Sequence, residues 1–375
     1  MKINIVTGPN FPVPPLAGGA ISKLWFSLAQ EFSRQGHSTT ILARAYDIQS
    51  AQEKINDVTV IRHGGFDQQA STLENLCCDL SYAWHTSRRI PPADITVIND
   101  FWLPAITPWL NPAAGKVVIN AARYPKHQYA LYSRCAAVVA CSQVIADTIN
   151  KQTPGLLDRV SVIHNPVDNI FLDSSRELPL GTPKKFLYVG RLHPEKGVHI
   201  LLKSFRHIHA EFPDVSLTIT GPHETGQGGG GKKYLKSLQS TAQDLPVVFS
   251  GPVFNPNQLV FTFCEHDLFI YPSLAEFGEA MPVAPLEAMA CGLPPVVPNL
   301  KCFADYITNK TGFLYSASPD EGDQQARLTE TLRDVLSSSS SFAERRSAAM
   351  ETAKTFSAQR IATEFLELFT QLVKS

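Results

Sequence analysis

This sequence lacks charge of one dominant sign, regular cysteine spacing and long apolar runs. A formal net charge of −1 gives no general attraction to nucleic acid or to anionic membranes. The seven cysteines, an odd number, fall in no CxxC or Cys/His pattern, which favours reduced thiols over disulfides or zinc. No apolar segment near residue 1 has the length of a signal peptide or a membrane span. We therefore expect a cytoplasmic protein with no nucleic-acid partner and at most peripheral membrane contact.

The 375 residues suit two domains better than one hydrophobic core. Apolar runs alternate with stretches of helical spacing, which predicts parallel βαβ units and doubly wound α/β domains. In the first half the expected strands are 2–6, 39–42, 58–62, 95–98, 116–120, 136–140 and 160–163, and the helices are 21–32, 72–89 and 143–150. In the second half the expected strands are 186–189, 215–220, 247–250, 267–271, 294–297 and 311–314, with helices near 201–208, 284–291, 303–307 and 358–373.

Two glutamates, Glu279 and Glu287, flank the start of the short helix expected at 284–291. Pro285 is tolerated in the first turn of a helix, and Gly292 suits its C-terminal cap. Free backbone N–H groups at a helix start favour an anion, while carboxylates accept hydrogen bonds from hydroxyl groups. The stretch therefore suits a sugar nucleotide, although a solvated helix face can also carry two acids at this spacing.

Two cations, Arg191 and Lys196, lie between the strand expected at 186–189 and the helix that follows. Placed side by side, a guanidinium and an ammonium neutralise a diphosphate. The glycine run 226–231 precedes two lysines and no Ser or Thr, so it does not meet the phosphate-loop pattern. We expect it to be a flexible loop.

Three motifs carry a resemblance to a known family. Glu279-x7-Glu287 followed by Ala-Met-Ala-x-Gly-x-Pro resembles the donor-site signature of family 4 retaining glycosyltransferases of GT-B architecture. Gly-Arg-Leu-x3-Lys-Gly at 190–197 matches a second signature, and 165–168 resembles the crossover between domains. The resemblance implies two Rossmann-like, doubly wound parallel-sheet domains facing across a cleft. We expect an N-terminal acceptor domain at 1–173 with the helix 358–375 packed back on it, and a C-terminal donor domain at 174–357.

The resemblance implies transfer of a hexose from a nucleoside-diphosphate sugar to a hydroxyl of a saccharide or lipid-linked saccharide, with retention. It assigns catalytic roles to Arg191, Lys196 and Glu279. The implied donor contacts are Gly18, Gly19, Gly190, Gly221, Val253, Phe254, Met281, Pro282, Val283 and Glu287. Pro282 stands where the family often has glycine, so one backbone N–H is missing. No Asp-x-Asp motif is present, and we expect neither a metal nor a cofactor. We expect a UDP- or GDP-sugar as donor. The identity of the base cannot be inferred from the side chains, because backbone groups recognise it.

The acceptor side departs from the family. Many members carry a histidine against the transferred sugar where this chain has Asn99 and Asp100. We expect these two residues, with Arg123, Lys126 and His127, to be candidate acceptor contacts. The apolar run 101–110 fits either a lipid-linked acceptor or core packing.

Two alternatives to transfer stay open: a GT-B sugar-nucleotide epimerase, and a catalytically degenerate partner protein that binds nucleotide sugar. An epimerase would release free nucleotide without an acceptor. Families of this kind usually act in bacterial polysaccharide or glycoconjugate synthesis, so the inner face of the cytoplasmic membrane is an expected location.

Overall fold

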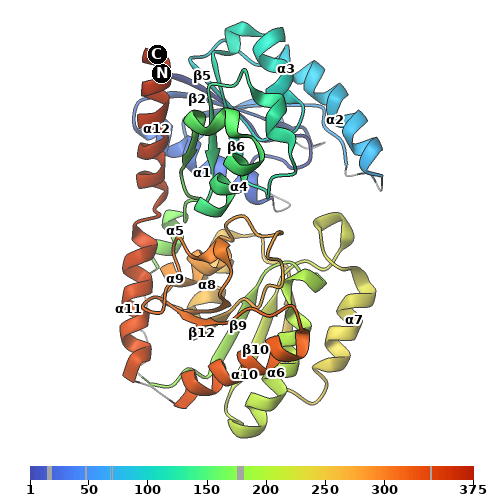
Figure 1. The fold of residues 1–375 in the computed structure, drawn as a ribbon, viewed down its shortest axis with the longest axis vertical. Coiled ribbons are helices and arrows are strands. Elements are labelled where there is room, and N and C mark those ends of the chain that lie inside the picture. Colours follow the sequence, from blue (N-terminus) through green and yellow to red (C-terminus); the bar gives the residue numbers. More distant parts are fainter. Residues whose placement is uncertain (15–18, 47–48, 68, 70, 175–180, 338–339) are drawn as a thin grey trace. The chain divides into compact units, whose positions relative to one another are not determined.

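A computed structural model gives the fold of the chain (Figure 1). It describes residues 1–375 except 15–18, 47–48, 68, 70, 175–180 and 338–339. The chain forms two compact units, one of Met1–Pro166 with Ala358–Ser375, the other of Val167–Ser357. Within the described residues each unit contains one sheet that is parallel or nearly so. The α/β class predicted from the alternating pattern is therefore confirmed.

The strands of the first unit form a sheet in the order β3-β4-β2-β1-β5-β6-β7-β8. Neighbours run parallel, except that β3 pairs antiparallel with β4 at one edge. The chain winds outward from β1 in both directions, so the carboxyl ends of β1 and β5 form the topological switch point. The strands are β1 (Lys2–Val6), β2 (Ser38–Arg44), β3 (Gln52–Ile55), β4 (Val58–His63), β5 (Ile95–Ile98), β6 (Lys116–Ala121), β7 (Ala137–Ala140) and β8 (Val160–Val162).

The helices of the first unit bury their apolar faces on this sheet. In α1, Trp25, Leu28 and Phe32 repeat at helical spacing and are buried, which is the pattern expected of a core-facing helix. The α-helices are α1 (Ala20–Arg34), α2 (Thr72–Ser87), α3 (Leu103–Leu110), α4 (Gln143–Gln152) and α12 (Ala358–Lys374), and the 3-10 helices are η1 (Pro112–Ala114), η2 (Gln128–Tyr132) and η3 (Pro154–Arg159).

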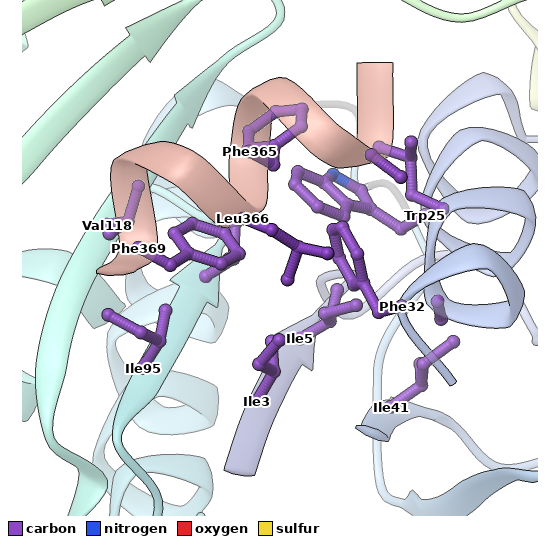
Figure 2. Packing of buried hydrophobic residues seen from close by; sticks show 14 of the residues in the cluster. Ile3, Ile5, Trp25, Phe32, Ile41, Ile95, Val118, Phe365, Leu366 and Phe369 are labelled. Carbon is purple, nitrogen blue, oxygen red and sulfur yellow. The ribbon is translucent and has the colours of Figure 1, made fainter. Parts of the chain in front are cut away.

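The C-terminal helix α12 closes the core of the first unit, beside α1 (Figure 2). Phe365 of α12 meets the ring of Trp25 edge-on, with ring centroids 5.1 Å apart. Phe369 contacts Phe32 in the same way, at 5.9 Å. Such aromatic pairs add packing energy beyond the area they bury. The first and last helices of the chain therefore share one core.

The second unit contains a parallel sheet in the order β11-β10-β9-β12-β13-β14, taking its described residues. Here β9 is flanked by β10 and β12, so the second switch point lies at the carboxyl ends of β9 and β12. The strands are β9 (Lys185–Val189), β10 (Ser216–Thr220), β11 (Val247–Gly251), β12 (Leu268–Ile270), β13 (Pro295–Pro298) and β14 (Phe313–Tyr315).

Most helices of this unit connect its strands, whereas α10 and α11 follow its last strand. The α-helices are α5 (Asn169–Leu172), α6 (Val198–Glu211), α7 (Gly231–Thr241), α8 (Pro256–Cys264), α9 (Ala284–Ala290), α10 (Glu321–Ser337) and α11 (Ser340–Lys354), and the 3-10 helices are η4 (Pro194–Lys196), η5 (Thr225–Gln227) and η6 (Lys301–Phe303). Across both units, none of the helices among the described residues combines the length and apolar character needed to cross a membrane.

The boundary between the units lies earlier than the sequence predicts. The expected division at 173/174 is replaced by Pro166/Val167, because the chain joins the second unit as soon as it leaves β8. The backbone N–H of Val167 donates to the carbonyl of Phe356 at 2.8 Å. Phe171 is fully buried and packs its ring against Phe263, with centroids 5.9 Å apart. These contacts hold 167–173 in the second unit.

Some local predictions were wrong. The glycine run is not a plain loop, because η5 starts at Thr225 and α7 starts at Gly231. It is tied down by its own backbone: Gly230 N–H donates to the carbonyl of Leu192, and Gly231 N–H to that of His223, both at 2.7 Å. The helix expected at 303–307 is the 3-10 turn η6 instead. The strand β3 and the helix α11 were not predicted.

We predict that Phe365→Ala lowers the free energy of unfolding of the first unit by about 3–5 kcal/mol, the usual cost of emptying a buried phenylalanine site. All four tryptophans belong to the first unit, so tryptophan fluorescence during urea unfolding reports that unit. Val373→Ala is the matched control on the same helix, since Val373 is 43% exposed. A loss no larger than that of the control would contradict the role given to Phe365.

Candidate functional site

The residues of both family motifs meet at the switch point of the second sheet. Arg191 and Lys196 follow β9, and Glu279 follows β12. In an open parallel sheet, the loops after two such neighbouring strands form the usual ligand crevice. The topology therefore brings together residues that lie more than eighty positions apart in the chain.

The centre of the site is a buried ion pair between Lys196 and Glu279. The Lys196 Nζ donates to Glu279 Oε1 at 2.5 Å, and the two residues are 4% and 6% exposed. Two hydroxyl groups donate to the same oxygen: Tyr271 Oη at 3.0 Å and Ser273 Oγ at 2.9 Å. Buried charges are costly unless paired and hydrogen-bonded, and this carboxylate has both kinds of partner.

Tyr271 is a neutral hydrogen-bond donor in this cluster. Burial, and then the charge of Glu279, raise the pKa of the Tyr271 phenol well above its usual range. Tyr188 of β9 stacks on the Tyr271 ring with centroids 5.9 Å apart. The Tyr188 hydroxyl donates to the carbonyl of Arg191 at 2.9 Å, which fixes the backbone that carries the guanidinium.

Arg191 and Lys196 approach one oxygen of a third acidic residue, Glu195. Arg191 Nη2 lies 2.9 Å from Glu195 Oε1, and Lys196 Nζ lies 3.8 Å from the same atom. His193 Nδ1 lies 3.7 Å from it. The other end of the guanidinium, Nη1, donates to the carbonyl of Gly228 at 2.7 Å. Two cations and a histidine thus surround a carboxylate that the protein itself supplies.

Two glycines let these loops come together. A Cβ on Gly197, whose φ is +70°, would lie 2.0 Å from the carbonyl oxygen of Pro272. A Cβ on Gly221, with φ +152°, would lie 1.8 Å from that of Gly190. Only glycine fits backbone approaches this close. Gly190 and Gly221, predicted as donor contacts, therefore have a packing role in joining the loops after β9 and β10.

The second glutamate of the motif lies in α9. Glu287 is 5% exposed, and its N–H donates to the carbonyl of Val283 at 2.8 Å. The segment before α9 is also buried at Met281 and Pro282, and the Pro282 carbonyl accepts a hydrogen bond from Tyr306 Oη at 2.7 Å. The predicted contacts Met281, Pro282 and Val283 therefore lie in a segment between Glu279 and α9 that burial and the Tyr306 hydrogen bond keep in place.

The predicted base contacts follow β11. Phe254 is 39% exposed and Val253 is partly buried. Asn255 then caps α8, its Oδ1 accepting from the N–H of Asn257 at 2.9 Å. In the sheet, β11 is separated from β9 by β10, so this loop lies two strands away from Arg191.

The first unit holds the remaining donor candidates and the predicted acceptor contacts. Gly18 lies outside the described residues. Gly19 precedes α1 with φ +96°. Arg123, Lys126 and His127 are exposed on the segment after β6.

Asn99 and Asp100 follow β5 but face inward. Asn99 Oδ1 accepts from Trp25 Nε1 at 2.8 Å and from Asn120 Nδ2 at 2.7 Å, while its Nδ2 donates to the carbonyl of Val6 at 3.0 Å. The Asp100 carboxyl oxygens are buried. Burial, and then the neighbouring Asp79, raise the pKa of the Asp100 carboxyl well above its usual range. In this structure the Asn99 side chain joins elements of the first unit, and the Asp100 carboxyl oxygens are shielded from solvent.

Sequence reasoning missed Glu195, Tyr271 and Ser273. The signal for Glu195 was present, because an acid stands between two cations of the same loop. Tyr271 ends the strand predicted at 267–271 and Ser273 lies two residues beyond it, yet nothing in their spacing indicates that both hydroxyls meet Glu279. Among the described residues, no group of three or more His, Cys, Asp or Glu could hold a metal ion.

Comparison with known proteins finds a matching family and relatives of this chain. Residues 172–355 match the family described as "Glycosyl transferases group 1". The chain is 24% identical to spore coat protein SA of Bacillus subtilis, over 98% of this chain and 99% of that protein. It is 28% identical to the O-antigen chain mannosyltransferase RfbU of Salmonella typhimurium, over 54% of each chain.

Solved structures share the whole fold. A glycosyltransferase from Rickettsia africae superposes with a TM-score of 0.76 at 15% identity, covering 100% of this chain and 99% of that one. Anabaena Alr3699/HepE, solved in complex with UDP and glucose, gives a TM-score of 0.73 at 19% identity and covers 99% of both chains. Residues 172–355 therefore belong to the group 1 glycosyltransferases, and the fold of the whole chain is the GT-B architecture of these solved glycosyltransferases.

Proposed function

We propose that this glycosyltransferase moves a hexose from a nucleoside-diphosphate sugar to a hydroxyl of a saccharide or lipid-linked saccharide, with retention at the anomeric carbon. The observation that supports it best is the approach of Arg191 and Lys196 to one oxygen of Glu195. Two cations directed at one point form a site for an anionic group. They lie after β9, at the switch point where doubly wound sheets bind ligands.

In the proposed reaction, the bond between the anomeric carbon and the diphosphate oxygen breaks. The acceptor oxygen bonds to the same face of that carbon, and the departing diphosphate takes the acceptor proton. The negative charge on the diphosphate grows as the bond breaks. Arg191 and Lys196 are already oriented toward it, so they stabilise the transition state more than the ground state.

The two glutamates suit the sugar and ribose hydroxyl groups. All three hydrogen bonds described for the Glu279 carboxylate end on Oε1. This leaves Oε2 to accept a hydroxyl of the transferred hexose, with Glu287 placed for the ribose. Tyr271, Ser273 and Lys196 hold the carboxylate in place, so the hexose hydroxyl donates to a hydrogen-bond acceptor whose position is already set.

The donor is proposed to be a UDP- or GDP-sugar whose base contacts the loop at Val253 and Phe254. A structural neighbour was solved with UDP and glucose. One relative is named an O-antigen mannosyltransferase and another a lipopolysaccharide N-acetylglucosaminetransferase, which supports a place in bacterial polysaccharide synthesis. A thermal-shift panel of UDP, GDP and ADP sugars would identify the donor, because a bound ligand stabilises the folded state. Free nucleotide released with no sugar transferred would indicate the epimerase alternative.

We predict that Arg191→Ala lowers kcat/KM by about 10²–10³, the loss expected for one charge-stabilising donor. The Arg191 side chain is 42% exposed, so the variant should keep its melting temperature. The matched control is Arg206→Ala, an exposed arginine of α6 that donates to the carbonyls of Thr241 and Gln243. Full activity in Arg191→Ala would remove the residue from the site.

We predict that Lys196→Ala loses both activity and stability, because it leaves the buried Glu279 carboxylate without its cation. The double variant K196A/E279Q removes that unpaired charge, and its melting temperature should return toward that of the wild type while activity stays low. If the double variant regained activity together with stability, Lys196 would have a folding role only.

We predict that Glu195→Gln tightens binding of the nucleoside diphosphate by roughly 2–5-fold, as expected for removing a partly exposed charge worth about 1 kcal/mol or less. The Glu195 carboxylate occupies the point to which both cations are directed, so an incoming phosphate must displace it. Isothermal titration calorimetry measures the change. Glu211→Gln is the control, since it breaks another exposed arginine pair, with Arg333. Weaker binding would mean that Glu195 orients Arg191 for the ligand.

We predict that transfer activity persists in excess EDTA, because two fixed cations already offset the charge of the leaving diphosphate. The measurement compares initial rates with and without the chelator, followed by addition of Mg²⁺. Loss of activity that Mg²⁺ restores would contradict the proposed metal independence.

A further inference from the structure

The helix α2 exposes an apolar stripe to solvent. Leu73, Leu80 and Trp84 are 70%, 46% and 43% exposed, and Cys77 between them is exposed as well. Their spacings of four, three and four residues place all of them on one face of the helix. The opposite face, which includes Tyr82 and Ala83, is buried in the first unit. The helix therefore has two faces: one is buried in the first unit, and the other exposes apolar side chains to solvent.

Exposed apolar side chains continue onto the neighbouring elements. The helix α3 packs beside α2, on the side of the first unit away from α12 (Figure 1), and η2 contacts α3. Trp109 of α3 is 63% exposed, and Leu131 of η2 is 48% exposed. We call Leu73, Leu80, Trp84, Trp109 and Leu131 the apolar patch. A cluster of this kind, with two tryptophans, is unusual on a surface that meets only water.

Positive charge accompanies the apolar patch. The guanidinium of Arg88 lies over the Trp84 ring at 4.4 Å, and that of Arg134 lies over the Trp109 ring at 3.3 Å. In the described residues of segments 72–89, 103–110 and 123–134, Glu74 is the one exposed carboxylate. The exposed cations of these segments are Arg88, Arg89, Arg123, Lys126 and Arg134. The surface is therefore locally basic in a chain whose net charge is −1.

We propose that the apolar patch docks the first unit onto a bilayer surface that contains anionic lipids. Tryptophan and leucine enter the boundary between headgroups and acyl chains, while arginine reaches back to lipid phosphates. A second copy of the chain fits this surface less well, because a two-fold contact would bring like charges together. The surface is separate from the donor residues, so the proposal does not depend on the proposed reaction.

The test is cosedimentation of the full chain with phosphatidylcholine vesicles, with and without phosphatidylglycerol. We expect binding to the anionic vesicles that falls when NaCl is raised from about 0.1 M to about 1 M, where the Debye length shortens from about 10 Å to about 3 Å. The double variant W84S/W109S should bind at least about tenfold more weakly, since it removes two interfacial anchors. Its folding is checked by the fluorescence of the two remaining tryptophans, the buried Trp25 and the partly buried Trp102.

The matched control is V248S/F261S, which removes two apolar side chains of the second unit that are 59% and 63% exposed. It should bind anionic vesicles like the wild type. Equal binding to neutral vesicles, or equal loss in the control, would overturn the proposal. So would a dimer in sedimentation velocity that W84S/W109S dissociates while vesicle binding is absent.

Discussion

A buried ion pair between Lys196 and Glu279 joins two loops at the carboxyl end of the second unit's sheet. Lys196 comes from the loop after β9 and Glu279 from the loop after β12, and their charged atoms lie 2.5 Å apart with almost no access to water. Burying either charge alone would be strongly unfavourable. Lys196 therefore stabilises the loop that carries Glu279, and Glu279 stabilises the loop that carries Lys196. The hydroxyls of Tyr271 and Ser273 supply the remaining hydrogen bonds that make the pair tolerable.

The loops around this ion pair approach each other so closely that two positions have room only for glycine. Gly197 passes the carbonyl of Pro272, and Gly221 passes that of Gly190, at distances that exclude a Cβ. These approaches bring three loops to the carboxyl end of the second sheet. Arg191 is then oriented by the Gly228 carbonyl and by Glu195 before any ligand arrives. In the proposed reaction the guanidinium is therefore already in place, and the entering phosphate displaces the Glu195 carboxylate.

The first unit uses its polar and aromatic residues differently. Asn99 ties together the ends of β1, β5 and β6, and Asp100 is buried beside Asp79. Three of the four tryptophans show this: Trp25 packs in the core, whereas Trp84 and Trp109 are exposed under arginines. The same residue type thus supports the fold in one place and presents an apolar surface in another.

Much of this protein was determined by the sequence alone. Alternating apolar runs and helical spacing identified most strands and helices, because a buried strand and an amphipathic helix leave different periodicities. The motif residues Arg191, Lys196, Glu279 and Glu287 were recognisable from local spacing. Short elements were harder. The four residues of β3, Gln-Glu-Lys-Ile, are mostly polar and carry too weak a strand pattern. The start of α7 depends on the hydrogen bond from Gly230 to Leu192, a residue far earlier in the chain.

Other features were decided only by the tertiary structure. Asn99 and Asp100 stand at a strand end, as ligand contacts often do, yet their neighbours turn them inward. The unit boundary moved to Val167 because of a hydrogen bond to Phe356, far along the chain. Tyr271 and Ser273 became part of the site because folding directs both hydroxyls to the Glu279 carboxylate. Sequence spacing determines which residues share a strand or a helix face, but contacts between distant segments depend on how those elements pack.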